Sequence, residues 1–245
     1  MSATEFLTAS WAAPACVRTL VTTRAGGESQ PPWAGFNLAM HVGDDALAVA
    51  HNREALRAHL PAEPAWLNQV HGVHVVDAGE LSGAVPDADA SVAHGAGAVC
   101  VVMTADCLPV LLCDKAGSVV GAAHAGWRGL ADGVLEATVA AMGVPSGEIL
   151  AWLGPAIGPD AFEVGAEVRA HFVAHAPEAA EAFSDIGDGK YLADIYLLAR
   201  QRLAEAGVTE VSGGEHCTVI ERERFFSYRR DGVTGRMASL VWLEP

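Results

Sequence analysis

The chain is poor in basic residues, in cysteine and in long apolar runs, and each shortage excludes a class of protein. It holds 15 Lys and Arg against 30 Asp and Glu, a formal net charge of −15 at pH 7, which disfavours nucleic acid and anionic membranes as partners. No apolar run reaches the length of about 20 residues that a membrane-spanning helix needs. The five cysteines are an odd number without a Cys-x-x-Cys pair, which argues against a disulfide framework and indicates a reducing compartment.

The N-terminus also lacks the features of a secretory signal peptide. Its first five residues include Glu5, and no basic residue precedes Arg18. We therefore expect a cytoplasmic location. Because 51% of the 245 residues are hydrophobic and no linker or repeat interrupts them, we expect one catalytic domain over residues 1–245 and a monomer. Four thiols are expected to form no disulfides: Cys16, Cys100, Cys113 and Cys217.

Short apolar runs bounded by turn residues alternate with longer periodic segments, which predicts a mixed α/β fold. A loop rich in Asp and Ala is expected at 85–94, where Asp87 and Asp89 are solvated unless they bind a cation. Helices are predicted at 46–60, with Asp44 or Asp45 as the cap, and at 130–142, 164–175, 177–183 and 191–206. Strands are predicted at 17–23, 66–70, 73–76, 99–103, 108–113, 118–123, 149–153, 208–211, 215–219, 225–228 and 237–243.

The segment 98–130 contains the densest apolar runs, and we expect the rest of the chain to be organised around it. The turn at 114–117 joins two strands closely enough to form an antiparallel hairpin. Mirror pairing about this turn matches Cys113 with Ser118 and, carried outward, Cys107 with His124; a bulge at Gly117 would shift the pairing by one residue. A thiol and an imidazole thus meet at the open end of a rigid hairpin, as in a metal or nucleophile site.

A catalytic zinc ion takes three protein ligands and one water, so Cys107 and His124 need a third partner. His71 is the best candidate, because it ends a predicted strand before Gly72. His74 is its rival, but three residues further along a strand it would face the opposite side. Without metal, Cys107 and His124 could act as nucleophile and base of a cysteine hydrolase. A structural zinc site usually has four protein ligands, and we find no fourth.

Arginines gather near the C-terminus, which in an acidic chain predicts an anion site. Arg222 and Arg224 could equally form surface salt bridges. The segment around Arg229 and Arg230 follows an aromatic run and resembles a strand end, so one side chain should face the site and the other should pair with a carboxylate. We favour Arg229 as the inward residue. The cluster comprises Arg222, Arg224, Arg229, Arg230 and Arg236.

Short motifs follow one another along nearly the whole chain. They are TRAGG at 23–27, FNL at 36–38, NR at 52–53, QVHG at 69–72, TADCLPV at 104–110, HAGWRG at 124–129, GPAI at 154–157 and FSYRRDG at 226–232. Together they resemble the YfiH, or laccase-domain, family, which is also called the multicopper polyphenol oxidase or peptidoglycan-editing-factor family. The resemblance runs from about Thr22 to Met237, and no metal position departs from the family pattern.

The resemblance implies a single-domain layered sandwich of mixed sheets flanked by helices, shared with certain cysteine-dependent toxin deamidases. It also implies that His71, Cys107 and His124 are zinc ligands and catalytic residues. The implied activity is purine nucleoside phosphorylase, acting on adenosine, inosine and methylthioadenosine with phosphate, with an adenosine deaminase side activity. The residues expected at the substrate are Arg24, Asn37, Gln69, Arg128, Tyr228, Arg229 and Arg230.

The family's other names leave two alternatives. One is copper-dependent polyphenol oxidation, as in a laccase; the other is a cysteine hydrolase that edits peptidoglycan precursors. The residues favour zinc over copper, because a multicopper oxidase needs paired His-x-His ligands and this chain has none. A nucleotide-type zinc deaminase would show His-x-Glu and Pro-Cys-x-x-Cys, which are also absent. A single zinc held by one Cys and two His suits Lewis-acid or activated-water chemistry.

Overall fold

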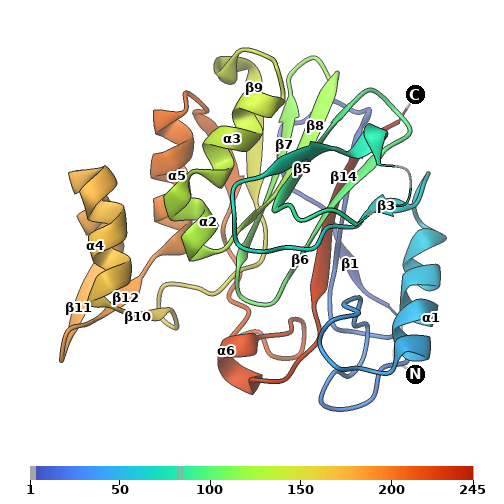
Figure 1. The fold of residues 1–245 in the computed structure, drawn as a ribbon, viewed down its shortest axis with the longest axis horizontal. Coiled ribbons are helices and arrows are strands. Elements are labelled where there is room, and N and C mark those ends of the chain that lie inside the picture. The colour runs from blue at the N-terminus through green and yellow to red at the C-terminus, as the bar shows by residue number, and fades with distance from the viewer. Residues whose placement is uncertain (1–3, 82, 84, 245) are drawn as a thin grey trace.

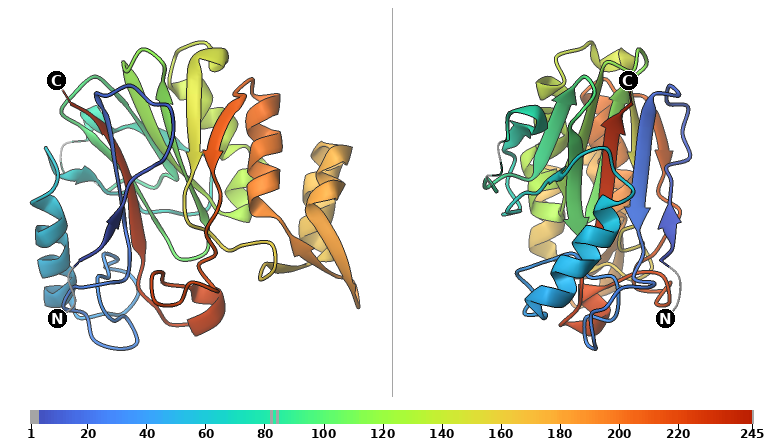
Figure 2. Two further views of the ribbon diagram at one scale, coloured as in Figure 1. Left: turned by 180° about the vertical axis from the view of Figure 1, so that it is seen from behind. Right: turned by 90° about the vertical axis from the view of Figure 1, so that its right-hand side faces the viewer.

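In the computed structural model, which describes residues 4–81, 83 and 85–244, two mixed β-sheets lie face to face between layers of helices (Figures 1 and 2). Sheet 1 has the order β1 (Phe6–Leu7), β2 (Val17–Thr22), β14 (Met237–Leu243), β6 (Val99–Thr104) and β3 (Pro64–Ala65). Sheet 2 has the order β13 (Glu210–Gly213), β9 (Ile149–Leu153), β7 (Leu108–Asp114), β8 (Val119–Ala125), β5 (Ala90–His94) and β4 (Val75–Asp77). The predicted mixed α/β layered sandwich is confirmed.

The central strands are apolar along their whole length because both of their faces are covered. In β7, Val110 and Leu112 pack beneath the helices, whereas Leu111 and Cys113 pack between the two sheets. Alternation along a strand sends successive side chains to opposite layers. The densest run of the sequence is therefore the centre of the sandwich.

Helices cover the outer face of each sheet. α1 (Ala46–Arg57) covers sheet 1, and Asp45 caps it by accepting hydrogen bonds from the backbone N–H groups of residues 47 and 48. Sheet 2 is covered by α2 (Trp127–Asp132), α3 (Val134–Ala141) and α5 (Ile195–Glu205). To the side in Figure 1 projects a small sheet with α4 (Ala166–His175), formed by β10 (Glu163–Gly165), β12 (Lys190–Ala193) and β11 (Phe183–Gly187). The short helical turns are η1 (Ala78–Glu80), η2 (Ser146–Glu148), η3 (Pro177–Ala182) and α6 (Tyr228–Asp231).

Several predicted elements were wrong in type or extent. The helix predicted at 130–142 begins earlier and is divided by Gly133, whose φ of 103° is left-handed and ends α2. The helix predicted at 191–206 begins as β12, and α5 starts only after Asp194 caps it. Of the strands predicted at 66–70, 73–76, 215–219 and 225–228, the second is confirmed in part by β4, which begins at Val75. The other three are mostly irregular, with isolated bridges from Asn68 to Asp87 and from Ala156 to Cys217. The expected loop at 85–94 contains β5, because its alanines pair beside β8 in the buried sheet.

The register of the central hairpin also differs from mirror pairing about 114–117. Cys113 lies opposite Val120, and His124 lies opposite Pro109, a shift of two residues from the prediction. The cause is Asp114, whose carboxylate accepts hydrogen bonds from the backbone N–H groups of Ser118 (2.6 Å) and residue 119 (3.0 Å) and so moves the turn forward. A shift of two residues keeps every side chain on its predicted face.

Two further expectations concern membranes and disulfides. Among the described residues, no helix is long and apolar enough to cross a membrane. The five cysteines are free thiols in the structure.

Candidate metal centre and substrate cleft

His71, Cys107 and His124 converge at one end of sheet 2. Their ligand atoms lie within 4.8 Å of one another, with 3.7 Å between Cys107 Sγ and His71 Nε2. The two imidazole rings meet edge to face at a centroid distance of 4.7 Å. Across the described part of the chain, this is the only group of three or more His, Cys or carboxylate side chains close enough to hold a metal ion. The predicted convergence of the three residues is present.

Asp89 was predicted to be solvated unless it binds a cation, and this prediction is wrong, because its carboxylate is buried behind the cluster and holds it in place. Asp89 is fully buried at the start of β5, and its Oδ1 lies 2.8 Å from His124 Nδ1. The same carboxylate accepts hydrogen bonds from the backbone N–H groups of Val70, His71 and Gly72. A carboxylate on Nδ1 leaves Nε2 of His124 to face a metal; metal-bound histidines typically donate their other ring N–H to a carboxylate in this way.

Strained backbone positions support two of the three side chains. His71 has a φ of 61° and Asp106, just before Cys107, a φ of 91°, which non-glycine residues rarely adopt. At His71 the Asp89 carboxylate holds the loop. At Asp106 the carboxylate accepts hydrogen bonds from Thr218 Oγ1 and from the backbone N–H of Arg229, both at 2.6 Å. Asp106 therefore ties the Cys107 loop to the start of α6.

Two glycines leave the space that the cluster occupies. A Cβ on Gly126 would lie 2.8 Å from His71 Cδ2 and 3.1 Å from Cys107 Sγ. A Cβ on Gly129 would lie 2.8 Å from the carbonyl oxygen of Gly72. The two distances of 2.8 Å are too short for a real side chain, so the glycines of the HAGWRG motif make room for the loops that carry His71 and Cys107.

The three groups shift one another's proton affinity. Burial alone would raise the pKa of Cys107, but the charge and hydrogen bonds of His124 and His71 outweigh it and lower the pKa to about 6. Burial would lower the pKa of His124, yet the Cys107 thiolate and the Asp89 carboxylate raise it to about 9. Burial also opposes ionisation of Asp89, but hydrogen bonds from His124 and the backbone lower its pKa. Between the pKa of Cys107 at about 6 and that of His124 at about 9, Cys107 is a thiolate and His124 an imidazolium in the metal-free protein.

A cleft with two lobes opens over the cluster. The polar lobe, of about 360 Å³, is lined by His41, Gln69, His71, Met103, Thr104, Ala105, Cys107, His124, Tyr228 and Arg236. The apolar lobe, of about 270 Å³, is lined by His71, Ala105, Asp106, Cys107, Trp127, Arg128, Ile157, Phe162, Ile195, Tyr228 and Arg229. His71, Ala105, Cys107 and Tyr228 line both, so the candidate metal centre lies where the lobes join.

Four of the predicted substrate residues line the cleft. Gln69 lines the polar lobe, with its amide paired to the backbone of Met103. Arg128 and Arg229 line the apolar lobe, and the exposed Tyr228 lines both.

The other three predicted substrate residues, Arg24, Asn37 and Arg230, line neither lobe. Arg24 donates to the carbonyls of Ala34 and Arg222 and stacks on Phe226. Asn37 is buried and accepts a hydrogen bond from the backbone N–H of Arg236.

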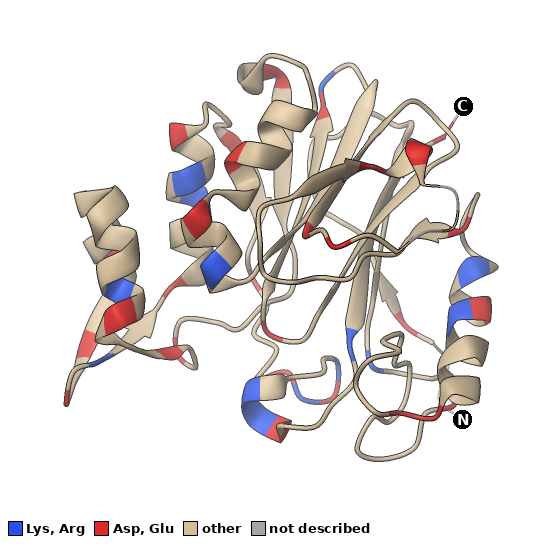
Figure 3. Cartoon of the chain, viewed as in Figure 1, with Lys and Arg blue, Asp and Glu red and all other residues tan. Residues whose placement is uncertain are grey.

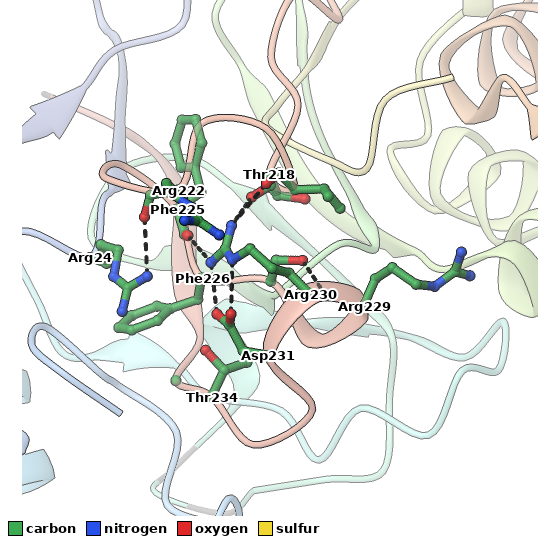
Figure 4. Close-up of polar contacts among 12 residues, drawn as sticks. Arg24, Thr218, Arg222, Phe225, Phe226, Arg229, Arg230, Asp231 and Thr234 are labelled. Atoms are coloured by element: carbon green, nitrogen blue, oxygen red, sulfur yellow. Dashed lines mark hydrogen bonds and ion pairs between the residues drawn. The ribbon is translucent and has the colours of Figure 1, made fainter. Parts of the chain in front are cut away.

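Arg229 and Arg230 lie on the short helix α6, not on the predicted strand, because Ser227 caps this turn by accepting from the Arg230 N–H. Arg230 pairs with Asp231 at 2.7 Å and donates to the carbonyls of residues 218, 219 and 225. Figure 4 shows the Arg229 side chain extending away from that network. Figure 3 shows one group of basic residues on α6 and the loop before it, with others on α1, α2 and α5. Arg222 and Arg224 were predicted either to bind an anion or to form salt bridges. Arg224 forms salt bridges with Glu221 and Glu5.

Three comparisons with known proteins agree with one another. Residues 18–244 match the family described as multi-copper polyphenol oxidoreductase laccase. The chain is 57% identical over 240 residues to a purine nucleoside phosphorylase of Pseudomonas aeruginosa, covering 98% of each chain. It is 54% identical to purine nucleoside phosphorylase YfiH of Escherichia coli, covering 98% of this chain and 99% of the relative. The crystal structure of Neisseria meningitidis protein NMB0706 superposes with a TM-score of 0.95 at 60% identity, covering 98% and 99%.

The chain belongs to the laccase-like YfiH family. The match confirms the resemblance seen in the motifs and covers the whole sandwich. The copper chemistry in the family description does not fit the residues of this member, because a multicopper site needs more histidine ligands than the single two-His, one-Cys cluster of its described residues.

The donor set of this family member fits one metal ion of the zinc type. Two imidazoles and one thiolate match zinc ligation with an open fourth position. Cys107 carries a lowered pKa, and Asp89 orients His124 so that its Nε2 can bind a metal once it releases its proton.

Proposed function

We propose that the protein is a zinc-dependent purine nucleoside phosphorylase that acts on adenosine, inosine and methylthioadenosine, with adenosine deamination as a side reaction. The observation that carries the proposal is the His71, Cys107, His124 cluster at the junction of a two-lobed cleft. Relatives more than 50% identical are named purine nucleoside phosphorylases. Their names support this reaction for the cleft of this chain.

In this proposal His71, Cys107 and His124 hold the zinc ion, which would act as a Lewis acid toward the sugar or a nucleophile. The chain's own residues bind and orient the substrates. Gln69 lies on one side of the centre, Arg128 and Arg229 lie on the other, and Tyr228 lies between them. A cation beside the cleft can hold phosphate through paired charge-assisted hydrogen bonds.

Product analysis tests the proposal. Inosine and adenosine are incubated with the zinc-loaded protein, with and without phosphate, and free base, ribose 1-phosphate and ammonia are measured. The proposal predicts equal amounts of base and ribose 1-phosphate that depend on phosphate, with ammonia only from adenosine. Base released at the same rate without phosphate would contradict phosphorolysis.

A second candidate is a metal-free cysteine hydrolase, as in editing of peptidoglycan precursors. One observation favours it: Asp89, His124 and Cys107 form a continuous carboxylate–imidazole–thiol series, with the Cys107 pKa lowered to about 6. Replacement of His71 separates the two functions, because a cysteine hydrolase needs Cys107 and His124 but no third ligand. Turnover that survives His71→Ala and exhaustive chelation would favour the hydrolase.

A further inference from the structure

The two lobes of the cleft have different chemistry. The polar lobe is lined by Arg236, His41, Gln69 and Thr104, and none of its described lining residues is Asp or Glu, although the chain holds 30 of them. The apolar lobe is lined by Trp127, Phe162, Ile157 and Ile195; it also has Arg128 and Arg229, and with them the carboxylate of Asp106, a like charge that disfavours an anion. An anion is stabilised in the first environment, and a flat aromatic base is stabilised in the second.

Phosphorolysis places its two substrates on opposite sides of one carbon atom. A phosphate oxygen forms a bond to C1′ of the ribose while the bond from C1′ to the base nitrogen breaks. The bonding pair goes to the base, which takes the proton that hydrogen phosphate gives up. Phosphate and base therefore need separate subsites with the sugar between them, which the two lobes joined at Cys107 and Tyr228 supply.

Arg236 is the best-placed cation for the phosphate. Its backbone N–H is fixed by buried Asn37 at 3.0 Å, and its Nη1 donates to the carbonyls of Thr234 and Gly235, both at 3.0 Å. Within the described residues its Nε and Nη2 make no hydrogen bond to the protein. A half-buried guanidinium fixed on one side, with donors free on the other, is pre-organised to grip an anion.

Both arginines lie beside an aromatic ring. Arg236 lies 5.9 Å from the centroid of Tyr228, which lines both lobes. The Arg229 guanidinium lies 5.7 Å from the centroid of Phe162, which lines the apolar lobe, and its Nη1 donates to the Ala161 carbonyl at 3.3 Å. Arg229 thus lies on the aromatic wall of the apolar lobe, where a purine base would stack.

From this contrast we infer that the polar lobe is the phosphate subsite, with Arg236 as its binding residue, and that the apolar lobe is the purine subsite. The assignment rests on the proposed phosphorylase function and deepens it. It moves the phosphate from Arg229, which the sequence favoured, to Arg236.

The test compares two matched variants, Arg236→Gln and Arg229→Gln, in the zinc-loaded protein. Initial rates are measured with inosine and phosphate each varied in turn, and binding of inorganic phosphate alone is measured by titration calorimetry. Arg236→Gln should raise the KM and the dissociation constant for phosphate by about tenfold or more, since a charge-assisted pair is lost, with the inosine KM little changed. Arg229→Gln should raise the inosine KM and leave the phosphate values unchanged.

Arg236→Lys keeps the charge without the planar fork and should fall between wild type and Arg236→Gln, which gives a second reading if the glutamine variant folds poorly. Unchanged phosphate KM and binding in both Arg236 variants would overturn the assignment, as would a phosphate defect confined to Arg229→Gln. Wild-type protein that makes no ribose 1-phosphate would instead refute the proposed function, and the subsite assignment with it.

Discussion

Replacing Asp89 by asparagine should loosen the candidate metal centre, because an amide cannot accept all the hydrogen bonds that the carboxylate accepts. Oδ1 lies 2.9 Å from the His71 N–H and 2.8 Å from His124 Nδ1, and Oδ2 lies 3.1 Å and 2.7 Å from the N–H groups of Val70 and Gly72. Asparagine offers one acceptor oxygen and one NH₂ donor. In either orientation, two donors therefore face another donor.

One of those clashes can be relieved if His124 moves its proton to Nε2, but that nitrogen is then unable to bind metal. One or two buried donors thus lose their acceptor, at about 1–3 kcal/mol each, so the free energy of unfolding should fall by ~1–6 kcal/mol. Zinc affinity should fall about 10- to 100-fold, as for loss of other second-shell carboxylates.

The assay is urea unfolding with and without zinc, together with chelator competition for the metal. Asp87→Asn is the matched control, because Asp87 is exposed and, among the described residues, its carboxylate hydrogen-bonds only to the Asn68 side chain, at 2.7 Å. It should change stability by less than about 0.5 kcal/mol. If Asp89→Asn behaved like Asp87→Asn in both assays, the Asp89 carboxylate would not be what fastens His71 and His124.

Three further predictions concern pH and packing. The pKa of Asp89 is lower in the folded protein than in the unfolded chain. Its contribution to stability is therefore complete above the unfolded pKa of about 3.9 and is lost as the pH falls below it. Asp89→Asn should flatten the acid limb of a curve of stability against pH, and an unchanged limb would contradict this. In metal-stripped protein, the alkylation attributable to Cys107, measured against Cys107→Ser, should rise with a midpoint near pH 6, whereas a midpoint above pH 8 would refute the thiolate pair. Gly126→Ala should weaken zinc binding through collision with His71, whereas Gly147→Ala, with open space around it, should not; equal affinities would mean that the cluster tolerates the added methyl group.

The fold was largely predictable where burial imposes a pattern. Strands β6, β7, β8 and β9 are buried on both faces, so their continuous apolar runs were enough to predict that they exist. Boundaries were wrong where a polar side chain decides the backbone path. Asp114 moves the hairpin register by two residues, and Asp194 starts α5 four residues later than the periodicity suggested.

The candidate site was predictable in part for the same reason. Cys107 and His124 lie at the end of one hairpin, and an error of two residues in register preserves the face of each side chain. Asp89 was predicted to be solvated because its segment is polar and has small residues, and only the fold shows it buried behind both histidines. Arg236 stood in the recognised arginine cluster, but its position at the polar lobe depends on a distant partner, Asn37.

The structure also distinguishes the copper interpretation of the family from the zinc interpretation. The described residues bring together only one cluster of possible ligands, and its donors are two imidazoles and a thiol. A redox centre of several coppers would need further histidines near it. Among the other described histidines, His41 lines the polar lobe without joining the cluster, whereas His171 and His175 lie elsewhere and pair with Asp132 and Glu205.

The central claim is that one metal ion held by His71, Cys107 and His124 supports phosphorolysis. The most direct measurement is a titration of metal-stripped protein with zinc, in which bound zinc and ribose 1-phosphate formation from inosine and phosphate are followed together. The account predicts that activity rises linearly and stops at one zinc per chain, and that Cys107→Ala neither binds this zinc nor forms product while keeping its fold. Full activity in the metal-stripped protein, or zinc bound equally by Cys107→Ala, would contradict it.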